Sequence, residues 1–376
     1  MGHSFYNSYY EINLRTIKEN INKIKAFHPD TDIITVLKAD AYGMGTGMMA
    51  RYLTKECGIN TFAVAQVCEG LKIRAEDINC PVLVLGPIPE EAVPYAIAND
   101  LMTPLFTKEQ ALILQREAEK QNTVAKAQIK IETGMNRIGV RPGYDLEALL
   151  NCLDDCPNIK TVGVYSHFAQ ADIKDDPFTM EQFEKFKRGV KQIEKRDFPL
   201  EYIHICNTSA TEWFKEAVAF STHVRVASLF LGYSDISNNS NPMDIKEALS
   251  WRASITAIHT VKKGETAGYG RFFKAEKDTE IAIAGVGFAD GLYGYGAKHH
   301  CPVLVNDTFT HYLDTCMDQC FIDVTGIKCK VGDPVTIFGY SPGGVLLSPK
   351  TFSYFGQAYT TYTSVGGLRS GKIYIE

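Results

Sequence analysis

Three absences narrow the class of protein. No apolar run approaches the length of a membrane span and no signal peptide opens the chain, so we expect a cytoplasmic protein that does not act in a membrane. The formal net charge of −5 gives no sign of the excess positive charge that nucleic-acid-binding proteins carry, so we do not expect nucleic acid as a partner. The ten cysteines include no C-x-x-C pair, and the closest spacings, Cys152/Cys156 and Cys316/Cys320, lack histidines at zinc-ligand spacing. We therefore expect reduced thiols and no metal site.

The chain of 376 residues is long enough for a large domain and a smaller one. Over its first part, strand-like apolar runs alternate with helical patterns. The strand-like runs cover residues 33–37, 62–67, 82–85, 101–105, 127–131, 161–166, 202–206 and 224–229. The helical patterns include residues 108–120, 144–154 and 180–195. This alternation predicts a parallel (β/α)8 barrel of the TIM type. A doubly wound sheet is the runner-up, but no G-x-G-x-x-G fingerprint follows the first strand.

The pattern changes after Gly232. Residues 237–242 form a polar, turn-rich stretch that is typical of a linker. The later segments are short, β-branched and bounded by turns, at residues 253–261, 280–287, 302–306, 320–324 and 334–338. We therefore predict an α/β protein with a barrel domain over residues 8–236 and a mainly β domain over residues 243–376, with which residues 1–7 could pair.

Candidate reactive residues fall at the carboxyl ends of the predicted barrel strands, where barrel enzymes place their active sites. They are Lys38 after the first strand, Arg137 after the fifth, His167 after the sixth, Asn207 and Thr208 after the seventh, and Arg225 in the eighth. Lys38 ends an apolar run and precedes a glycine-bearing loop, so partial desolvation would favour its neutral, nucleophilic amine. The alternative is a lysine that extends its charge into solvent from a strand end.

The residues around Lys38 resemble a family signature. Residues 38–43, Lys-Ala-Asp-Ala-Tyr-Gly, are similar to the cofactor-lysine motif of alanine racemases, which are pyridoxal-phosphate (PLP) enzymes with a barrel fold. The resemblance implies that Lys38 binds the cofactor covalently and that Tyr42 binds its phosphate. Met44 stands where many family members have histidine.

Residues 130–139 resemble the family's K-x-D-T-G-M-x-R-x-G segment. Without that context, Arg137 could equally be a surface-loop arginine, although the glycines favour a tight loop that aims a guanidinium. The resemblance implies that Arg137 contacts the cofactor's phenolic oxygen and the substrate carboxylate. Lys130 matches a supporting lysine that the family often carbamylates. Glu132 replaces the usual aspartate, which leaves the carbamate open.

Three further barrel segments resemble the family. A lone histidine after an apolar run is more often a hydrogen-bonded core residue, but the family histidine at His167 would orient the catalytic tyrosine. Asn207 and Thr208 match a phosphate-binding segment, with the Thr208 hydroxyl and N–H as donors. In the segment 224–228, Arg225 would face the pyridine nitrogen, with Ala227 and Ser228 as further cofactor contacts. Ala227 replaces a usual glycine.

The second domain carries the rest of the resemblance. Tyr269, in Ala-Gly-Tyr-Gly, matches the catalytic tyrosine that reaches the partner subunit's cofactor, although G-Y-G alone could be a turn with an aromatic plug. Met317 matches the residue whose N–H binds the substrate carboxylate, and Asp318 supports it. Phe288 replaces a frequent tyrosine. Tyr362 is aligned with a phosphate-binding tyrosine near a divergent tail.

Together the matches imply a PLP-dependent racemase that works as a head-to-tail homodimer on a small amino acid. Lys38 and Tyr269 of the partner subunit would act as two bases on opposite faces of the substrate. Alanine is the expected substrate, with serine or another small amino acid as the alternative, since residues 267–273 also resemble vancomycin-resistance serine racemases. A decarboxylase of similar architecture and a non-catalytic PLP-binding barrel are the competing classes.

Overall fold

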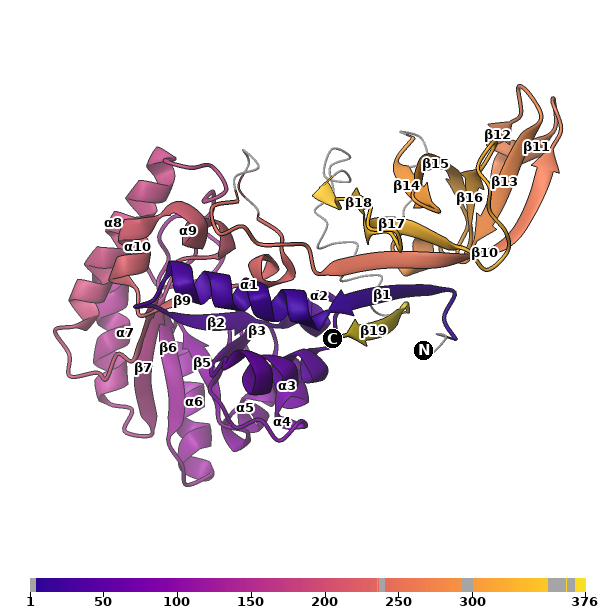
Figure 1. Cartoon of the computed structure of the whole chain (residues 1–376). Helices are drawn as coiled ribbons and strands as arrows, with labels where there is room; N and C mark the ends of the chain where they lie inside the picture. Colours follow the sequence, from indigo (N-terminus) through magenta and orange to yellow (C-terminus); the bar gives the residue numbers. More distant parts are fainter. Residues whose placement is uncertain (1–4, 235, 237–240, 293–299, 351–362, 364–368) are drawn as a thin grey trace. The chain divides into compact units, whose positions relative to one another are not determined.

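The computed structural model describes residues 5–234, 236, 241–292, 300–350, 363 and 369–376 (Figure 1). The chain divides into two compact units. The barrel unit comprises Lys18–Ala39 and Thr46–Lys246, and the β unit comprises Met1–Ile17, Asp40–Gly45 and Glu247–Glu376. The domain boundaries inferred from the linker at 237–242 stay predictions.

Eight parallel strands form the sheet of the barrel unit. They are β2 (Asp32–Val36), β3 (Phe62–Val64), β4 (Val82–Val84), β5 (Leu101–Leu105), β6 (Ala125–Lys130), β7 (Ile159–Tyr165), β8 (Tyr202–His204) and β9 (His223–Val226). Their order is β8-β7-β6-β5-β4-β3-β2-β9. Hydrogen bonds from Thr222 N to Ile203 O (2.8 Å) and from Arg225 N to Cys206 O (3.1 Å) join the two end strands and close the barrel.

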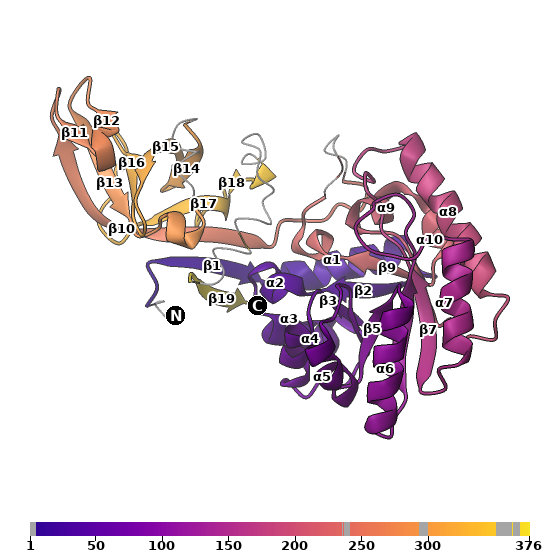
Figure 2. The ribbon, with the colours of Figure 1, turned by 180° about the vertical axis from the view of Figure 1, so that it is seen from behind.

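Helices cover the outside of the strands, as both ribbon views show (Figures 1 and 2). They are α3 (Thr46–Cys57), α4 (Val67–Arg74), α5 (Val93–Ala98), α6 (Lys108–Lys120), α7 (Tyr144–Asp154), α8 (Pro177–Ile193), α9 (Thr208–Trp213) and α10 (Lys215–Phe220), with 3-10 turns η1 (Glu90–Ala92) and η2 (Ser228–Leu231). The helix α1 (Leu14–Phe27) precedes β2. Local sequence fixes helix starts: Thr107 caps α6 by accepting from Gln110 N at 3.2 Å, and Asp176 caps α8.

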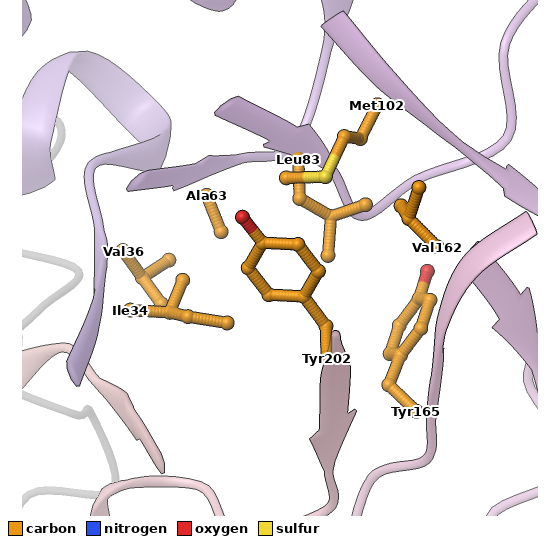
Figure 3. Close-up of a cluster of buried hydrophobic side chains, with 8 residues drawn as sticks. All are labelled: Ile34, Val36, Ala63, Leu83, Met102, Val162, Tyr165 and Tyr202. Carbon is orange, nitrogen blue, oxygen red and sulfur yellow. The ribbon is translucent and has the colours of Figure 1, made fainter. Parts of the chain in front are cut away.

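Buried side chains from β2, β3, β4, β5, β7 and β8 pack together in the barrel interior (Figure 3). The cluster contains Ile34, Val36, Ala63, Leu83, Met102, Val162, Tyr165 and Tyr202. Gly163 in β7 makes room for it, because a Cβ there would lie 2.6 Å from the Tyr202 Cβ. The interior is therefore a packed core rather than a pore, and chemistry is confined to the strand ends.

The β unit is built mainly on antiparallel strands. They are β1 (Ser8–Asn13), β10 (Leu249–Val261), β11 (Thr266–Ala267), β12 (Phe273–Lys274), β13 (Thr279–Ala284), β14 (Pro302–Val305), β15 (Thr308–Thr315), β16 (Cys320–Asp323), β17 (Pro334–Tyr340), β18 (Leu346–Leu347) and β19 (Gly371–Ile375), with 3-10 turns η3 (Tyr269–Arg271) and η4 (Phe288–Asp290). Because β17 pairs with both β14 and β10, the strands β10-β13-β16-β15-β14-β17 form a closed ring. β1 extends the sheet by pairing with β10, and it pairs in parallel with β19.

The predicted fold class is confirmed: a parallel eight-stranded barrel with helices is combined with an antiparallel C-terminal unit. The polar strand β15 and the C-terminal strand β19 were not among the predicted strands. Among the described residues, no helix combines the length and the apolar character that a membrane span needs.

Candidate active site

The backbone directly after β2 takes an unusual course. The element α2 (Lys38–Tyr42) is a helical turn of left-handed sense, because Ala39, Asp40, Ala41 and Tyr42 have φ of 52°, 56°, 54° and 56°. Left-handed helical backbone costs residues with a Cβ about 1–2 kcal/mol each. Such a cost persists only where the surroundings impose the conformation, and strained backbone of this kind gathers at functional sites.

Glu69 in α4 fixes the start of this turn. Its Oε1 accepts a hydrogen bond from Ala39 N (2.6 Å), while its Oε2 accepts from Ala65 N (2.7 Å) and Gln66 N (3.1 Å). One carboxylate thereby ties the carboxyl ends of β2 and β3 together. This places the backbone next to Lys38 at a defined position on the barrel rim.

The pKa of Lys38 is lowered. Displacement of water by the surrounding protein is the largest cause, followed by the charge of Arg137; Glu69 opposes the shift, and Arg225 adds to it. Solvent still reaches the side chain, so the amine can both exchange protons and meet a ligand. The lowered pKa favours a neutral, nucleophilic amine, as the strand-end position predicted.

Arg225 in β9 is almost fully buried and is held by its two terminal nitrogens. They donate to His204 Nδ1 (2.6 Å), His204 O (3.3 Å), Ser166 O (2.8 Å), His167 Nδ1 (3.0 Å) and Ile205 O (2.9 Å). Burial lowers the pKa of the guanidinium to about 10, which still leaves it charged near neutral pH. Two histidines and three backbone carbonyls thus surround the two terminal nitrogens.

These contacts fix the protonation of two histidines. A guanidinium can only donate, so the Nδ1 atoms of His204 and His167 must both be bare acceptors. His204 then donates from Nε2 to Gln128 Oε1 at 2.8 Å, and the Gln128 amide donates to the Met102 sulfur. Burial and then the Arg225 charge hold the pKa of both imidazoles well below its usual value. His167 is therefore neutral, with its one proton on Nε2.

Lys130 ends β6 beneath the same rim. Its ammonium lies 5.1 Å from the centroid of the Tyr165 ring, and its hydrogen bond to Ile131 O is long at 3.4 Å. Burial lowers the pKa of Lys130 to about 7, and Arg225 adds to the shift while Glu132 opposes it. A substantial neutral fraction of this amine is thus expected near physiological pH.

Arg137 stands on the tight loop 131–140. Ile131 and Val140 form a β-bridge, and Gly139 (φ 135°) is obligatory because a Cβ would lie 2.6 Å from Glu132 N. Thr133 Oγ1 lies 2.9 Å from Ser166 Oγ, which pins the loop to the end of β7. Arg137 is exposed, and its positive charge lowers the pKa of Lys38, Lys130 and His167. Its electrostatic influence therefore reaches the other charged residues of the rim.

The predicted phosphate-binding residues lie at the ends of β8 and β9. Asn207 caps α9 by accepting from Ala210 N at 3.1 Å, and Thr208 opens that helix. The Ala227 N–H donates to Thr208 Oγ1 (3.1 Å), so it is used within the protein rather than left for a ligand. Buried Ser228 begins η2.

The predicted residues of the β unit are exposed rather than packed. Tyr269 is 80% exposed and begins η3 between Gly268 (φ 80°) and Gly270 (φ 63°). Met317 is 61% exposed; its carbonyl accepts from Ala289 N (2.9 Å). Asp318 follows it. Tyr362 lies outside the described residues.

The structure thus brings most of the predicted barrel residues to one rim: Lys38, Lys130, Arg137, His167, Asn207, Thr208, Arg225, Ala227 and Ser228. Sequence reasoning missed Glu69 and Gln128 as functional candidates, and it noted His204 only as part of the stretch that resembles the family's histidine-and-phosphate segment. Glu69 sits three residues after Gln66 in a capping-box pattern, which was the available signal. Gln128 gave no signal, because a polar residue inside an apolar strand is recognised only once its partner is known.

Known proteins resemble the whole chain. The sequence models "Alanine racemase, N-terminal domain" and "Alanine racemase, C-terminal domain" match residues 12–235 and 248–355. The alanine racemase of Clostridium tetani is 33% identical over 372 residues, covering 97% of this chain and 94% of that protein. Alanine racemase 2 of Caldanaerobacter subterraneus is 34% identical over 337 residues, covering 89% and 86%.

Among solved structures, the alanine racemase of Bacillus anthracis with bound L-Ala-P has a TM-score of 0.92 and 26% identity, and covers 100% of this chain and 96% of that one. The rim of charged residues, the two-unit fold and these likenesses agree. The chain is a member of the alanine racemase family of isomerases.

Proposed function

We propose that this protein is a PLP-dependent racemase that interconverts L- and D-alanine. The observation that carries the proposal is the pairing, on one barrel rim, of a lysine of lowered pKa with a buried arginine that five hydrogen bonds hold in place. Three supporting groups surround that pair: the neutral His167, the Arg137 guanidinium, and the donors at the ends of β8 and β9.

The donor set fits PLP chemically. Lys38, Lys130, Arg137 and Arg225 lower one another's pKa or that of their neighbours, so the rim carries excess positive charge. An anionic ligand with a phosphate and a phenolate would relieve this charge. Lys38 would hold the cofactor covalently, Tyr42, Thr208, Asn207 and Ser228 would hold its phosphate, and Arg137 its phenolic oxygen. Arg225 would donate to the pyridine nitrogen.

When bound, PLP supplies an electron sink that makes the Cα–H of an amino acid acidic. The chain's own groups then move the proton. Lys38 takes or returns it on one face of Cα, and Tyr269 of the partner subunit does so on the other, since inversion needs two opposed bases. A phenol acts as a base only with help from nearby cations, which the charged rim of the partner's site would supply. The Nε2–H of His167 is free to orient that phenol.

The charge at Arg225 decides where the proton returns. Arg225 would lie beside the pyridine nitrogen of PLP, where its fixed positive charge would disfavour a second cation. Arg225 in this position would favour return of the proton to Cα. Racemisation is thereby favoured over transamination.

The exposed residues of the β unit motivate a head-to-tail homodimer. Tyr269 (80%), Met317 (61%), Phe272 (48%) and Phe288 (45%) are all solvent-exposed in the single chain. Exposed aromatic and methionine side chains are typical of protein interfaces. In the proposed dimer, Tyr269 and the Met317 N–H would complete the partner subunit's site, with Met317 and Arg137 holding the substrate carboxylate. The ten free thiols fit a reducing, cytoplasmic location.

The test uses purified protein loaded with PLP. L-alanine and L-serine are supplied separately, and formation of each D-enantiomer is followed by chiral chromatography. We expect alanine to be the better substrate. Lys38→Ala should abolish covalent PLP binding and racemisation, while Lys126→Ala, at an exposed lysine on β6, should change neither. PLP captured on another lysine, or PLP binding at Lys38 without any D-product, would refute the proposal.

A further inference from the structure

We propose that the C-terminal strand β19 is a clamp for the turn that follows the cofactor lysine, with Lys372 and Tyr374 as its positioning residues. The inference rests on the proposed function, since it concerns how Lys38 and Tyr42 are presented to PLP. It deepens that function by assigning roles to residues more than 300 positions away in the sequence.

Two polar contacts connect β19 to the turn. Lys372 Nζ lies 3.2 Å from Asp40 Oδ2, and both side chains are 24% exposed, so the ion pair is largely shielded from water. The Tyr374 hydroxyl donates a hydrogen bond to Met44 O at 2.8 Å. The segment Asp40–Gly45 accordingly belongs to the same compact unit as β19.

One contact is made within the turn and the other just after it. Asp40 lies within the run of left-handed residues and Met44 lies just beyond it. Inside the turn, the hydrogen bonds are Gly45 N to Asp40 O (2.8 Å) and Met44 N to Ala41 O (3.2 Å). Non-glycine residues do not hold a left-handed conformation by themselves, so partners outside the turn must impose it. Glu69 does so at Ala39, and β19 does so at Asp40 and Met44.

The strand is built for this contact. Lys372 and Tyr374 are two positions apart, so their side chains leave the same face of β19. The parallel pairing of β1 with β19 sets their register, with Tyr10 opposite Lys372 and Ile12 opposite Tyr374. Burial raises the pKa of Tyr374 to about 12, so its hydroxyl stays a donor.

Gly45 shows how closely the clamp approaches. A Cβ at Gly45 would lie 2.6 Å from the Tyr374 hydroxyl oxygen, and the residue has φ of 89°. Any larger residue would push the phenol away and strain the turn. The glycine therefore provides space for the clamp as well as backbone freedom.

The experiment measures the affinity of the apo-protein for PLP and the rate at which Lys38 captures it in a borohydride-trappable form. Tyr374→Phe keeps the ring and removes only the donor, and we expect it to weaken PLP binding about fivefold. Lys372→Met should weaken it about threefold, and Lys372→Arg should restore it to near wild type. Capture by Lys38 should slow in parallel.

A matched control lies elsewhere in the β unit. Lys262→Met breaks an exposed ion pair with Asp278 and should not change PLP affinity. Asparagine tolerates positive φ, so Asp40→Asn removes the charge without disturbing the turn. If the Lys372–Asp40 ion pair is responsible, adding Lys372→Met to Asp40→Asn should cause no further loss of PLP affinity. Melting temperature is recorded for every variant.

The outcomes separate the two proposals. Wild-type protein that captures no PLP at Lys38 refutes the proposed function. Wild-type capture combined with unchanged affinity in Tyr374→Phe and Lys372→Met overturns the clamp and leaves the function standing. A lower melting temperature with unaltered PLP affinity, or no rescue by Lys372→Arg, reduces β19 to a structural role and overturns the clamp as well. If Lys372→Met fails to fold, the isosteric Tyr374→Phe decides.

Discussion

The charged rim of the barrel unit and the exposed loops of the β unit are built on opposite principles. Arg225 is 3% exposed and donates five hydrogen bonds, and it fixes the protonation of two histidines. Tyr269 is 80% exposed and stands between two glycines of positive φ. One group is positioned by its own unit, and the other has its phenol in solvent.

This difference shows what each half can do alone. A rim with buried, hydrogen-bonded partners can bind and orient a cofactor within a single chain. An exposed phenol with an ordinary loop environment can neither be oriented nor activated until something covers it. Under the proposed function, the residues of the rim would bind the cofactor, and the Tyr269 phenol would exchange a proton only once it is covered by a partner.

Tyr269→Phe should separate activity from stability most sharply. Loss of one base should reduce racemisation about 10²- to 10⁴-fold, while stability changes by less than about 0.5 kcal/mol because the phenol is exposed. Deuterium wash-in at Cα, measured separately from L- and D-alanine, should be lost from one enantiomer only. Equal loss from both would make this a structural tyrosine. Tyr144→Phe, 88% exposed on the barrel unit, is the control.

Arg225→Glu should lower activity and stability together, in contrast to Tyr269→Phe. A carboxylate there faces the carbonyls of Ser166 and Ile205 that the guanidinium now satisfies, which should cost about 3 kcal/mol or more. Racemisation should slow and pyruvate should accumulate, because a carboxylate keeps the pyridine nitrogen protonated. Arg225→Lys keeps the charge and should form less pyruvate. A folded, PLP-binding Arg225→Glu variant without pyruvate would show that Arg225 does not face this nitrogen.

Lys130→Met tests the buried charge with a smaller effect. The folded pKa is about 7, below the usual lysine value, so wild-type stability should rise as pH increases from about 7 to about 10. The stability gained by Lys130→Met should be about 2–3 kcal/mol larger at pH 6 than at pH 9, measured by urea unfolding of apo-protein without bicarbonate.

Lys126→Met, at the exposed end of the same strand, should show no such difference. Bicarbonate should abolish the pH dependence of wild type if Lys130 is carbamylated, since the charged amine is then replaced. A pH-independent gain in bicarbonate-free buffer would contradict the lowered pKa.

Much of the barrel could be predicted because apolar runs and strand ends are local signals. Helices α6 and α7 have the predicted bounds. The apolar runs also placed Lys38 and His167 just after strands and Arg225 within the eighth strand. The C-terminal strand β19 was missed because its residues are mixed in polarity and, among the described strands, pair with β1 alone.

The left-handed turn shows where sequence reasoning stops. Glycine is the usual signal for positive φ, but Ala39, Asp40, Ala41 and Tyr42 are all non-glycine. The contacts that impose their conformation come from Glu69 and from β19, which are remote in the sequence. The capping-box pattern marks Glu69 but not its contact with Ala39, and the contacts of β19 and the Gln128–His204–Arg225 chain leave no local pattern.

Complementation between two defective chains tests the central claim most directly. Lys38→Ala and Tyr269→Phe chains are co-produced with different affinity tags, and the doubly tagged dimers are isolated. If each site takes Lys38 from one chain and Tyr269 from the other, a mixed dimer contains one intact site and should recover about half of wild-type racemase activity. Activity no higher than that of the separately purified variants would contradict a site shared between two subunits.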